Sequence, residues 1–339
     1  MLDYSTVAKA LADMGAPSYR TDQVYRALTR ELITDFGQIT TLPEAVRTAL
    51  GERLNAVQID EALTLGSRDG TALKTAFRAR SDGSPIEAVL TRLGGRASVC
   101  VSSQVGCAVG CAFCASGRAG LVRNLSAEEM VDQVLHFARR LRAEGKRVTN
   151  VVVMGMGEPF QNYEQTLLAC RLLNDPRGFG LAARSISVST AGVVPGIYRF
   201  AREPLQLNLA VSLHAATDDL RDRLVPLNRT YPLKTLFAAC AHYVEQTRRK
   251  LLFEYVVLEG VNDGAPQVRA LAEQLRRPLY HLNLIAFNET GGGFRRPSPR
   301  RLAALREDLE RRGVSVTVRR SPGADVEAAC GQLALRQRR

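Results

Sequence analysis

The chain has 339 residues, of which 45% are apolar and 24% charged, and its 46 basic residues against 34 acidic ones give a net charge of +12. This composition can form a buried core, so it excludes disordered and collagen-like chains, and no apolar run approaches the roughly 20 residues of a membrane span. Residues 1–5 show neither the basic start nor the apolar stretch of a secretory signal. We therefore expect a cytoplasmic protein without membrane contact, whose seven cysteines stay reduced as thiols or metal ligands.

The basic residues are nearly all arginines, since only five of the 46 are lysines. An arginine excess suits the binding of phosphate groups, as in nucleic acids. A GC-rich genome would also enrich arginine and alanine without any binding partner. Charge alone therefore leaves both explanations open.

The first 55 residues are predicted to form a small helical domain. Ser5 and Thr21 are suitable N-caps for two helices, and Pro43 suits the first turn of a third. Residues 56–92 then change to short strand-like runs at 73–77 and 86–90, separated by the turn pairs Asp69-Gly70 and Asp82-Gly83. We expect a β-rich connector in this region.

Residues 93–339 alternate between short β-branched runs and helical stretches, which predicts an α/β fold with a parallel sheet, as a partial barrel or an open sheet. The expected strands cover residues 98–102, 149–154, 185–189, 207–213, 252–258 and 281–287. Unusual residues follow these strands, such as Cys107, Glu158, His214 and Asn288. In parallel α/β folds ligands bind at this edge, so we expect one active site there.

The strongest motif is the C-x3-C-x2-C spacing of Cys107, Cys111 and Cys114. Thiolates select zinc or iron–sulfur clusters, but a structural zinc site needs four ligands, and no nearby cysteine or histidine pair completes such a set. The spacing resembles that of the radical S-adenosylmethionine (SAM) superfamily. This resemblance implies a [4Fe-4S] cluster whose open iron binds SAM and cleaves it to a 5′-deoxyadenosyl radical, with zinc as the alternative.

Residues 155–159 (GMGEP) would by themselves mark only a tight turn. After the second strand, however, the glycines can let backbone carbonyls approach a ligand, and Glu158 can accept from an ammonium group. The segment resembles the SAM amino-group motif of the superfamily. Ser189, His214 and Asn288 are candidates for ribose and methionyl contacts, although a lone His214 could equally be a buried, hydrogen-bonded residue.

Four cysteines lie outside the motif. Cys170 and Cys240 are expected in the core, on amphipathic helices. For Cys100 and Cys330 the residues alone favour the same interpretation, because free cysteine is among the most buried residue types.

Three segments resemble one family, the RlmN/Cfr adenine methyltransferases of RNA: residues 100–107 (CVSSQVGC), 154–159 (MGMGEP) and 328–333 (AACGQL). The similarity covers nearly the whole chain and includes Tyr19-Arg20, Leu42-Pro43, Arg123-Asn124-Leu125, Gly192-Val193-Val194-Pro195 and Val261-Asn262-Asp263. It implies a radical SAM partial (β/α)6 barrel that carries Cys330 in its C-terminal segment, with a helical accessory domain that binds RNA.

The resemblance also implies a role for particular residues. Cys330 would be methylated on sulfur, Cys100 would resolve the covalent protein–RNA adduct, and Glu87 would accept a proton. A disulfide bond is expected as well. The cluster ligands would be Cys107, Cys111 and Cys114, and the SAM contacts would be Gly157, Glu158, Ser189, Ser212, Leu213, His214 and Asn288.

The resemblance finally implies a reaction and its partners. The enzyme would methylate carbon 2 of an adenine in 23S rRNA, at the peptidyl transferase centre, and of an adenine in the tRNA anticodon loop. It would consume two SAM molecules, act as a monomer and take electrons from a donor such as flavodoxin or ferredoxin. The helical domain and four arginine pairs would bind phosphates: Arg295-Arg296, Arg300-Arg301, Arg319-Arg320 and Arg338-Arg339.

Two alternatives remain open. Residues 157–159 (GEP) favour carbon 2, whereas residues 114–117 (CASG) and Gly120-Leu121 lean toward a second branch of the family, which methylates carbon 8 and confers antibiotic resistance. A non-catalytic, zinc-stabilised RNA-binding protein would use the same cysteines and arginines. We expect carbon 2 methylation.

Overall fold

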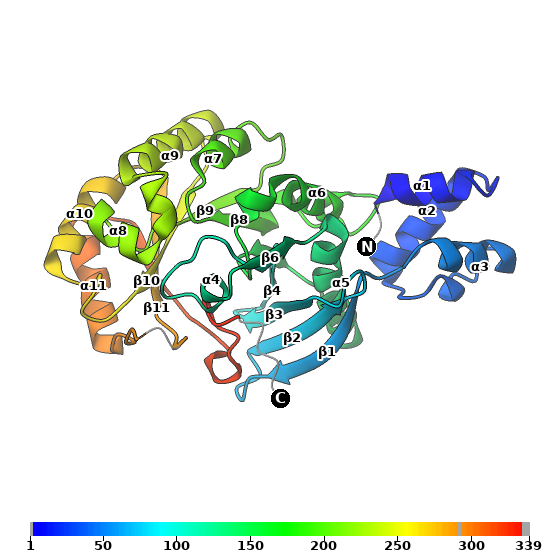
Figure 1. Cartoon of the computed structure of the whole chain (residues 1–339), viewed down its shortest axis with the longest axis horizontal. Coiled ribbons are helices and arrows are strands. Elements are labelled where there is room, and N and C mark those ends of the chain that lie inside the picture. The colour runs from blue at the N-terminus through cyan, green and yellow to red at the C-terminus, as the bar shows by residue number, and fades with distance from the viewer. Residues whose placement is uncertain (1–2, 291–292, 334–339) are drawn as a thin grey trace.

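The computed structural model describes residues 3–290 and 293–333. The main body consists of a sheet with helices packed around it, and the N-terminal helices extend from one side of this body (Figure 1). The C-terminal segment, red in Figure 1, returns beside the strands of the connector.

The N-terminal region is helical, as predicted, and has an apolar cluster of its own that includes Val7 and Leu50. Two predicted caps are wrong. The Asp3 carboxylate, rather than Ser5, caps the first helix and accepts from the Thr6 amide at 2.8 Å. Thr21 is buried inside the second helix, which begins two residues earlier. The elements are α1 (Tyr4–Ala12), α2 (Tyr19–Arg26), the π-helix η1 (Ala27–Glu31), η2 (Phe36–Gln38) and α3 (Glu44–Arg53).

The connector contains three antiparallel strands, β1 (Ile59–Gly66), β2 (Ala72–Ala79) and β3 (Pro85–Leu93). Gly70 and Gly83, with φ of +69° and +73°, form the predicted turns, because residues with a side chain rarely adopt this conformation. β3 also pairs antiparallel with the first strand of the main body, so the connector extends the main sheet.

The main sheet continues with seven parallel strands in the order β4-β7-β8-β9-β10-β11-β12. All six predicted strands are present, and the expected α/β class is confirmed. The seventh, β12, was missed because it has four residues at the edge of the sheet and only two of them are apolar. The bounds are β4 (Arg96–Val101), β7 (Asn150–Val153), β8 (Ile186–Thr190), β9 (Asn208–Ser212), β10 (Leu251–Val257), β11 (Tyr280–Ala286) and β12 (Val316–Arg319).

Helices cover the outer face of this sheet. Alternate residues of a strand point to opposite faces, so Val99 and Val101 of β4 join the main core while Cys100 packs in a separate cluster on the inner face. None of the helices in the described part of the chain is long and apolar enough to cross a membrane. The helices are α5 (Ala127–Ala143), η3 (Pro159–Asn162), α6 (Tyr163–Asn174), η4 (Ala183–Ser185), α7 (Val194–Phe200), α8 (Asp218–Leu224), η5 (Pro226–Arg229), α9 (Leu233–Thr247), α10 (Ala265–Leu275), α11 (Pro299–Arg311) and η6 (Ala324–Val326).

Candidate active site

The cysteine motif lies on a loop that is closed by a small antiparallel sheet. Strands β5 (Gln104–Gly106) and β6 (Leu121–Asn124) form this sheet, and the short helix α4 (Ala115–Ala119) lies within the loop. At the base, the Cys107 amide donates to the Gly120 carbonyl at 2.9 Å. Gly106 has φ of +77°, and a Cβ atom there would overlap the same carbonyl oxygen. Only glycine fits this position without moving the loop.

Two distant segments hold the cysteine loop in place. The Ala112 amide donates to the Leu224 carbonyl at the end of α8, at 3.0 Å. The Ala115 amide donates to the Gly331 carbonyl of the C-terminal segment, at 2.9 Å. The loop is therefore fixed between the barrel and the residue that follows Cys330.

The three motif cysteines belong to one cluster of apolar side chains, together with Phe113. Burial raises the pKa of Cys107 to about 11 and raises the pKa of Cys111 well above its ordinary value, and Cys114 shifts both in the same direction. Such thiols stay protonated unless a metal binds them, because the metal coordinates the thiolate and displaces the proton. This donor set fits the [4Fe-4S] cluster that the resemblance implies.

Within residues 3–290 and 293–333, no three His, Cys, Asp or Glu side chains lie close enough together to hold a single metal ion. The motif supplies three cysteines, whereas a structural zinc site is closed by four ligands. Three cysteines would suffice for a [4Fe-4S] cluster, in which each binds a different iron and the fourth iron stays open.

Glu158, on the loop after β7, is buried and accepts two backbone amides: Phe160 donates to Oε1 at 2.9 Å and Ala191 donates to Oε2 at 2.6 Å. Burial raises its pKa to about 7, and the two amides oppose this shift. The carboxylate thus joins the ends of β7 and β8. Each oxygen keeps a second lone pair, with which it could accept from the ammonium group of SAM.

The glycines of this loop are needed for a reason that the sequence did not predict. Gly157 has φ of +107°, and a Cβ atom there would lie 2.7 Å from Gln104 Cβ and from Ser103 Oγ. A Cβ atom at Gly155 would lie 2.7 Å from Ser102 Oγ. Close packing against the segment before the cysteine loop, rather than the approach of a ligand alone, requires both glycines.

His214 is buried at the end of β9 and adopts φ of +59°. Its Nδ1 accepts from the Val256 amide at 3.0 Å, and its ring meets Phe113 of the cysteine loop edge-on, with 4.7 Å between centroids. Asn262 supports the strained backbone by donating to the His214 carbonyl at 2.8 Å. Burial lowers the pKa of His214 to about 3, so the imidazole is neutral and can contact a ligand through its other nitrogen.

The remaining candidate SAM contacts lie at the same edge of the sheet. Ser189, in β8, donates from its hydroxyl to the Val153 carbonyl at 3.0 Å. The carbonyls of Ser212 and Leu213, at the end of β9, accept from Arg221 at 3.1 and 3.0 Å. The sequence gave no reason to single out this arginine.

The C-terminal segment brings Cys330 to this edge. The Asn288 side-chain nitrogen, Nδ2, donates to the Cys330 carbonyl at 3.4 Å. Ala328 and Leu333 pack in one cluster with Val89 of β3, and Cys100 lies against that cluster. The segment therefore covers the inner face of the connector strands.

Cys100 and Cys330 are neighbours. Burial raises the pKa of Cys100 to about 12, with Cys330 acting in the same direction. Cys330 is exposed, yet the protein around it still raises the pKa of its thiol, while Arg319 opposes that shift and Cys114 adds to it. Cys330 thus lies near both Cys100 and Cys114 of the cysteine loop. All seven cysteines are free in this structure, so the expected disulfide bond is absent from it.

Glu87 lies on β3, and the register places it on the same face as Cys100, because Val89 is directly opposite Cys100. Its carboxylate is buried and forms an ion pair with Lys74 Nζ at 3.0 Å. Sequence reasoning missed Lys74, although a lysine within a strand of an arginine-rich chain was a usable signal.

Several of the arginines expected to bind phosphate form hydrogen bonds or ion pairs with other residues of the chain. Arg296 donates to Asn288 Oδ1 at 2.6 Å, Arg301 pairs with Asp263 at 2.8 Å, and Arg319 pairs with Glu254 at 3.1 Å. Arg338 and Arg339 lie outside the described residues. Arg295, Arg300 and Arg320 are exposed and remain candidates.

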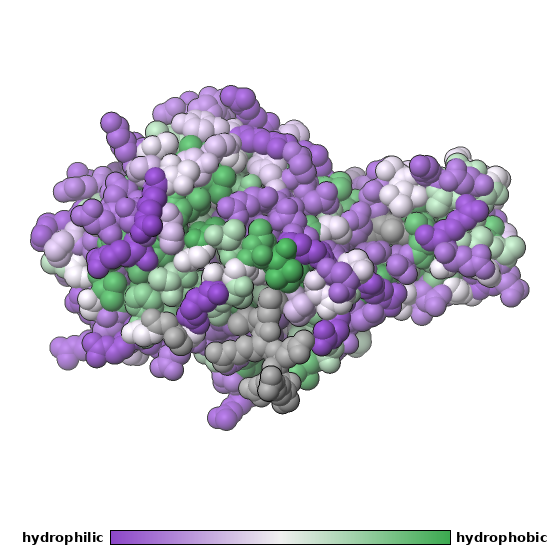
Figure 2. Space-filling view, in the orientation of Figure 1, coloured by the Kyte–Doolittle hydropathy of each residue, from purple (hydrophilic) through white to green (hydrophobic). Residues whose placement is uncertain are grey.

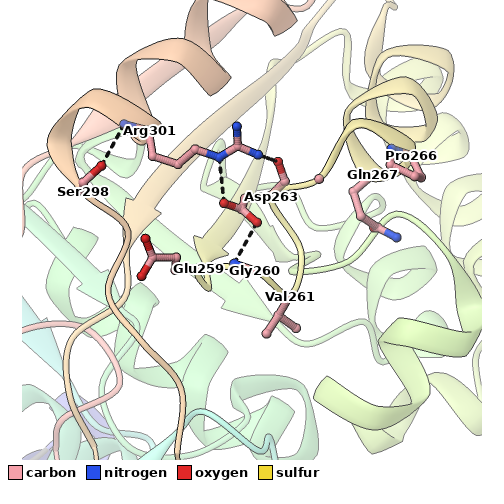
Figure 3. Close-up of a pocket in the computed structure, with 9 residues that line it drawn as sticks. Glu259, Gly260, Val261, Asp263, Pro266, Gln267, Ser298 and Arg301 are labelled. Carbon is pink, nitrogen blue, oxygen red and sulfur yellow. Dashed lines mark hydrogen bonds and ion pairs between the residues drawn. The ribbon is translucent and has the colours of Figure 1, made fainter.

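A cavity of about 690 Å³ lies outside this site, between the loop after β10 and the start of α11 (Figure 3). Asp263 occupies its wall, where it accepts from Arg301 and from the Gly260 amide, the latter at 3.0 Å. The motif at residues 261–263 is thereby explained structurally, since Asn262 supports His214 and Asp263 orders the loop.

Comparison with known proteins shows the family of the chain. Residues 101–272 match the Radical SAM superfamily. A protein of Symbiobacterium thermophilum, described as "Probable dual-specificity RNA methyltransferase RlmN", is 44% identical over 98% of this chain and 90% of that relative. A "Ribosomal RNA large subunit methyltransferase N" of Nitrosopumilus maritimus is 41% identical over 96% and 95%. A solved radical SAM methyltransferase of Sphaerobacter thermophilus is 49% identical, covers 98% of this chain and 97% of its own, and superposes with a TM-score of 0.95.

Proposed function

The chain belongs to the RlmN family of radical SAM RNA methyltransferases, and from that premise we propose that it methylates carbon 2 of an adenine in 23S rRNA, at the peptidyl transferase centre, and of an adenine in the tRNA anticodon loop. The relatives described as dual-specificity enzymes support two RNA substrates. As a radical SAM enzyme the chain uses a [4Fe-4S] cluster and SAM. The observation that carries the proposal is the placement of Cys100 and Cys330: Cys100 packs against the cluster that contains Ala328, and Gly331, next to Cys330, accepts from the cysteine loop.

An adenine ring carbon flanked by nitrogens is electron-poor, so it cannot attack a sulfonium methyl group as a nucleophile. A thiolate can, and Cys330 is the exposed thiol beside the cysteine loop. When bound, the cluster and SAM supply the methyl group, the electron and the radical that removes hydrogen from it. The Cys330 side chain then carries the methylene carbon to the ring.

After the addition, the adduct is a radical and would give up one electron, for which the cluster would be the acceptor when bound. The ring carbon then holds a proton and is joined to Cys330 through the methylene group. Glu87 would take the proton, and its carboxylate lies on the same sheet face as Cys100. The Cys100 thiolate would attack the Cys330 sulfur, so the carbon–sulfur bond breaks and its electron pair, with a proton, completes the methyl group. The two cysteines would leave as a disulfide, which a thiol reductant must reopen.

The other proposed roles follow the geometry of the sheet edge. Cys107, Cys111 and Cys114 would bind the cluster. Seven residues at the ends of β7, β8, β9 and β11 would contact SAM: Gly157, Glu158, Ser189, Ser212, Leu213, His214 and Asn288.

We propose that RNA contacts both the helical domain and the mouth of the barrel. Tyr19 is exposed on α2, with the Arg20 guanidinium 4.9 Å from its ring centroid. Figure 2 shows an apolar area over β6, where Leu121 and Val122 are exposed. Bases must leave the helical stack to reach a reactive centre, and exposed aromatic and apolar side chains suit unstacked bases. We also propose that the protein acts as a monomer in the cytoplasm and receives electrons from flavodoxin or ferredoxin.

The test is anaerobic incubation of the reconstituted protein with SAM, a reductant and unmodified 23S rRNA or tRNA, followed by mass spectrometry of the digested nucleosides. We expect 2-methyladenosine from both RNAs. Formation of 8-methyladenosine would instead identify the carbon 8 reaction, and neither product from protein with a full cluster would refute the proposed substrate.

A further inference from the structure

Arg221, on α8, is wholly buried, with an exposed fraction of 0%. Its guanidinium donates to the carbonyls at two strand ends, to Leu213 at 3.0 Å, Ser212 at 3.1 Å and Ala191 at 2.6 Å. Nη1 donates to the Asn228 side-chain oxygen at 3.0 Å. This side chain therefore holds the ends of β8 and β9, where SAM is expected to bind.

The buried charge of Arg221 has no carboxylate partner within 4.0 Å among residues 3–290 and 293–333. Asn228 separates it from the nearest acids, donating to Asp218 at 2.9 Å and to Asp222 at 2.7 Å. A buried cation without an ion-pair partner is costly, because the interior replaces the lost hydration poorly. The four neutral hydrogen bonds satisfy its geometry but do not neutralise its charge.

The cysteine loop packs against the helix that carries Arg221. The Ala112 amide, directly after Cys111, donates to the Leu224 carbonyl at the end of α8 at 3.0 Å, and Leu220 and Leu224 pack in one cluster with the three motif cysteines. Arg221 therefore lies beside the proposed cluster ligands. A [4Fe-4S] core held by three thiolates carries a net negative charge, which grows when the cluster is reduced.

We propose that Arg221 is the fixed counter-charge of the iron–sulfur cluster and raises its reduction potential. The proposal rests on the assignment of Cys107, Cys111 and Cys114 as cluster ligands. A fixed cation stabilises the more negative, reduced cluster more than the oxidised one, so a one-electron donor reduces it more readily. The burial of Arg221 strengthens this effect, because electrostatic interactions are stronger in a low dielectric.

The experiment compares the purified, anaerobically reconstituted protein with three variants. Arg221→Gln removes the charge, and Arg221→Lys keeps it while losing most of the hydrogen bonds. Arg249→Gln is the matched control, because Arg249 is a part-buried arginine that donates to Leu207 and Asn208 at the opposite end of β9. Iron and sulfide contents are measured first, and the potential is then titrated with mediators and followed by electron paramagnetic resonance, without RNA or SAM.

We expect a more negative midpoint potential in Arg221→Gln only, with at least a tenfold smaller equilibrium constant for reduction, equivalent to about 59 mV for one electron. Unchanged potential in Arg221→Gln, or equal shifts in Arg221→Gln and Arg221→Lys, would overturn the proposal. If Arg221→Gln does not fold, Asp222→Asn decides: removing this acid should shift the potential upward, and no shift would refute the counter-charge role.

These measurements test the role of Arg221 separately from the proposed RNA substrate. A wild-type protein that binds no iron would overturn the counter-charge and the cluster ligands together. The expected potentials combined with the wrong methylated nucleoside would leave Arg221 as the counter-charge and refute only the proposed substrate.

Discussion

Lys74 Nζ lies 3.0 Å from Glu87 Oε1, and less than a tenth of either side chain is exposed. The same ammonium donates to the Glu327 carbonyl at 3.3 Å, three residues before Cys330. One cation thus connects the proposed proton acceptor with the segment that carries the proposed methyl-bearing cysteine. The ion pair therefore orients the Glu87 carboxylate beside the segment that carries Cys330.

Replacing Lys74 with methionine should destabilise the protein by about 3–5 kcal/mol, because it breaks a buried ion pair by removing one partner. The double variant Lys74→Met/Glu87→Gln should recover part of this loss. Arg80→Met is the control, since its ion pair with Asp60 at 2.7 Å is largely exposed and should contribute less than about 1 kcal/mol. Urea unfolding measures all three, and equal losses in Lys74→Met and Arg80→Met would contradict the prediction.

Gly106→Ala should prevent the cysteine loop from closing, so the variant should bind much less iron on reconstitution. The added Cβ atom would overlap the Gly120 carbonyl oxygen. Gly110→Ala is a matched control in the same loop: Gly110 also has positive φ, +70°, but nothing lies within 4 Å of its Cβ position. The control should lose only about 1–2 kcal/mol of backbone energy and keep its cluster. If the iron content falls equally in both variants, the positive φ angle prevents the loop from closing, and the overlap with the Gly120 carbonyl oxygen does not.

His136 should make the protein less stable in mild acid. Burial lowers its pKa to about 4, the two flanking arginines, Arg139 and Arg140, add to this, and Glu61 opposes it. When the pH lies between this pKa and the ordinary histidine pKa of 6.5, the unfolded chain binds a proton that the folded chain does not. Stability is therefore lost as the pH falls through this window, by at most about 1.4 kcal/mol per pH unit.

The variant His136→Gln tests this, with unfolding measured from pH 8 down to pH 4.5. Above pH 7 the two proteins should differ by a constant, since the lost ring contact with Phe77, 4.9 Å between centroids, does not depend on pH. Below 6.5 the wild type should lose stability relative to the variant. If the two proteins differ by the same stability over the whole pH range, His136 is not the source of the loss of stability in acid.

The sheet was predictable because each parallel strand is a short β-branched run followed by a helix. The caps of α1 and α2 were harder to predict than the strands, because Asp3, Ser5 and Ser18 are all plausible caps and only packing selects among them. The spacing of Cys107, Cys111 and Cys114 predicted a shared site, and the structure places all three in one cluster on one loop. By contrast, Arg221 and Lys74 act through contacts with residues distant in sequence, and no local pattern separates them from surface cations. The same reason explains why the intramolecular partners of Arg296, Arg301 and Arg319 were not predicted, since they lie 8, 38 and 65 residues away.

The two thiols should have distinct and ordered roles. Cys330→Ala should abolish methylation, because no thiol then carries the methyl group to the RNA. Cys100→Ala should instead leave RNA covalently bound to Cys330, because the carbon–sulfur bond has no second thiol to break it. Denaturing gel electrophoresis of radiolabelled RNA with each variant detects the adduct, and peptide mass spectrometry locates it.

Cys170→Ala is the control, as that buried thiol on α6 lies outside the proposed site and the variant should methylate RNA. Normal product from Cys330→Ala, or an adduct in the double variant Cys100→Ala/Cys330→Ala, would show that another residue carries the methyl group.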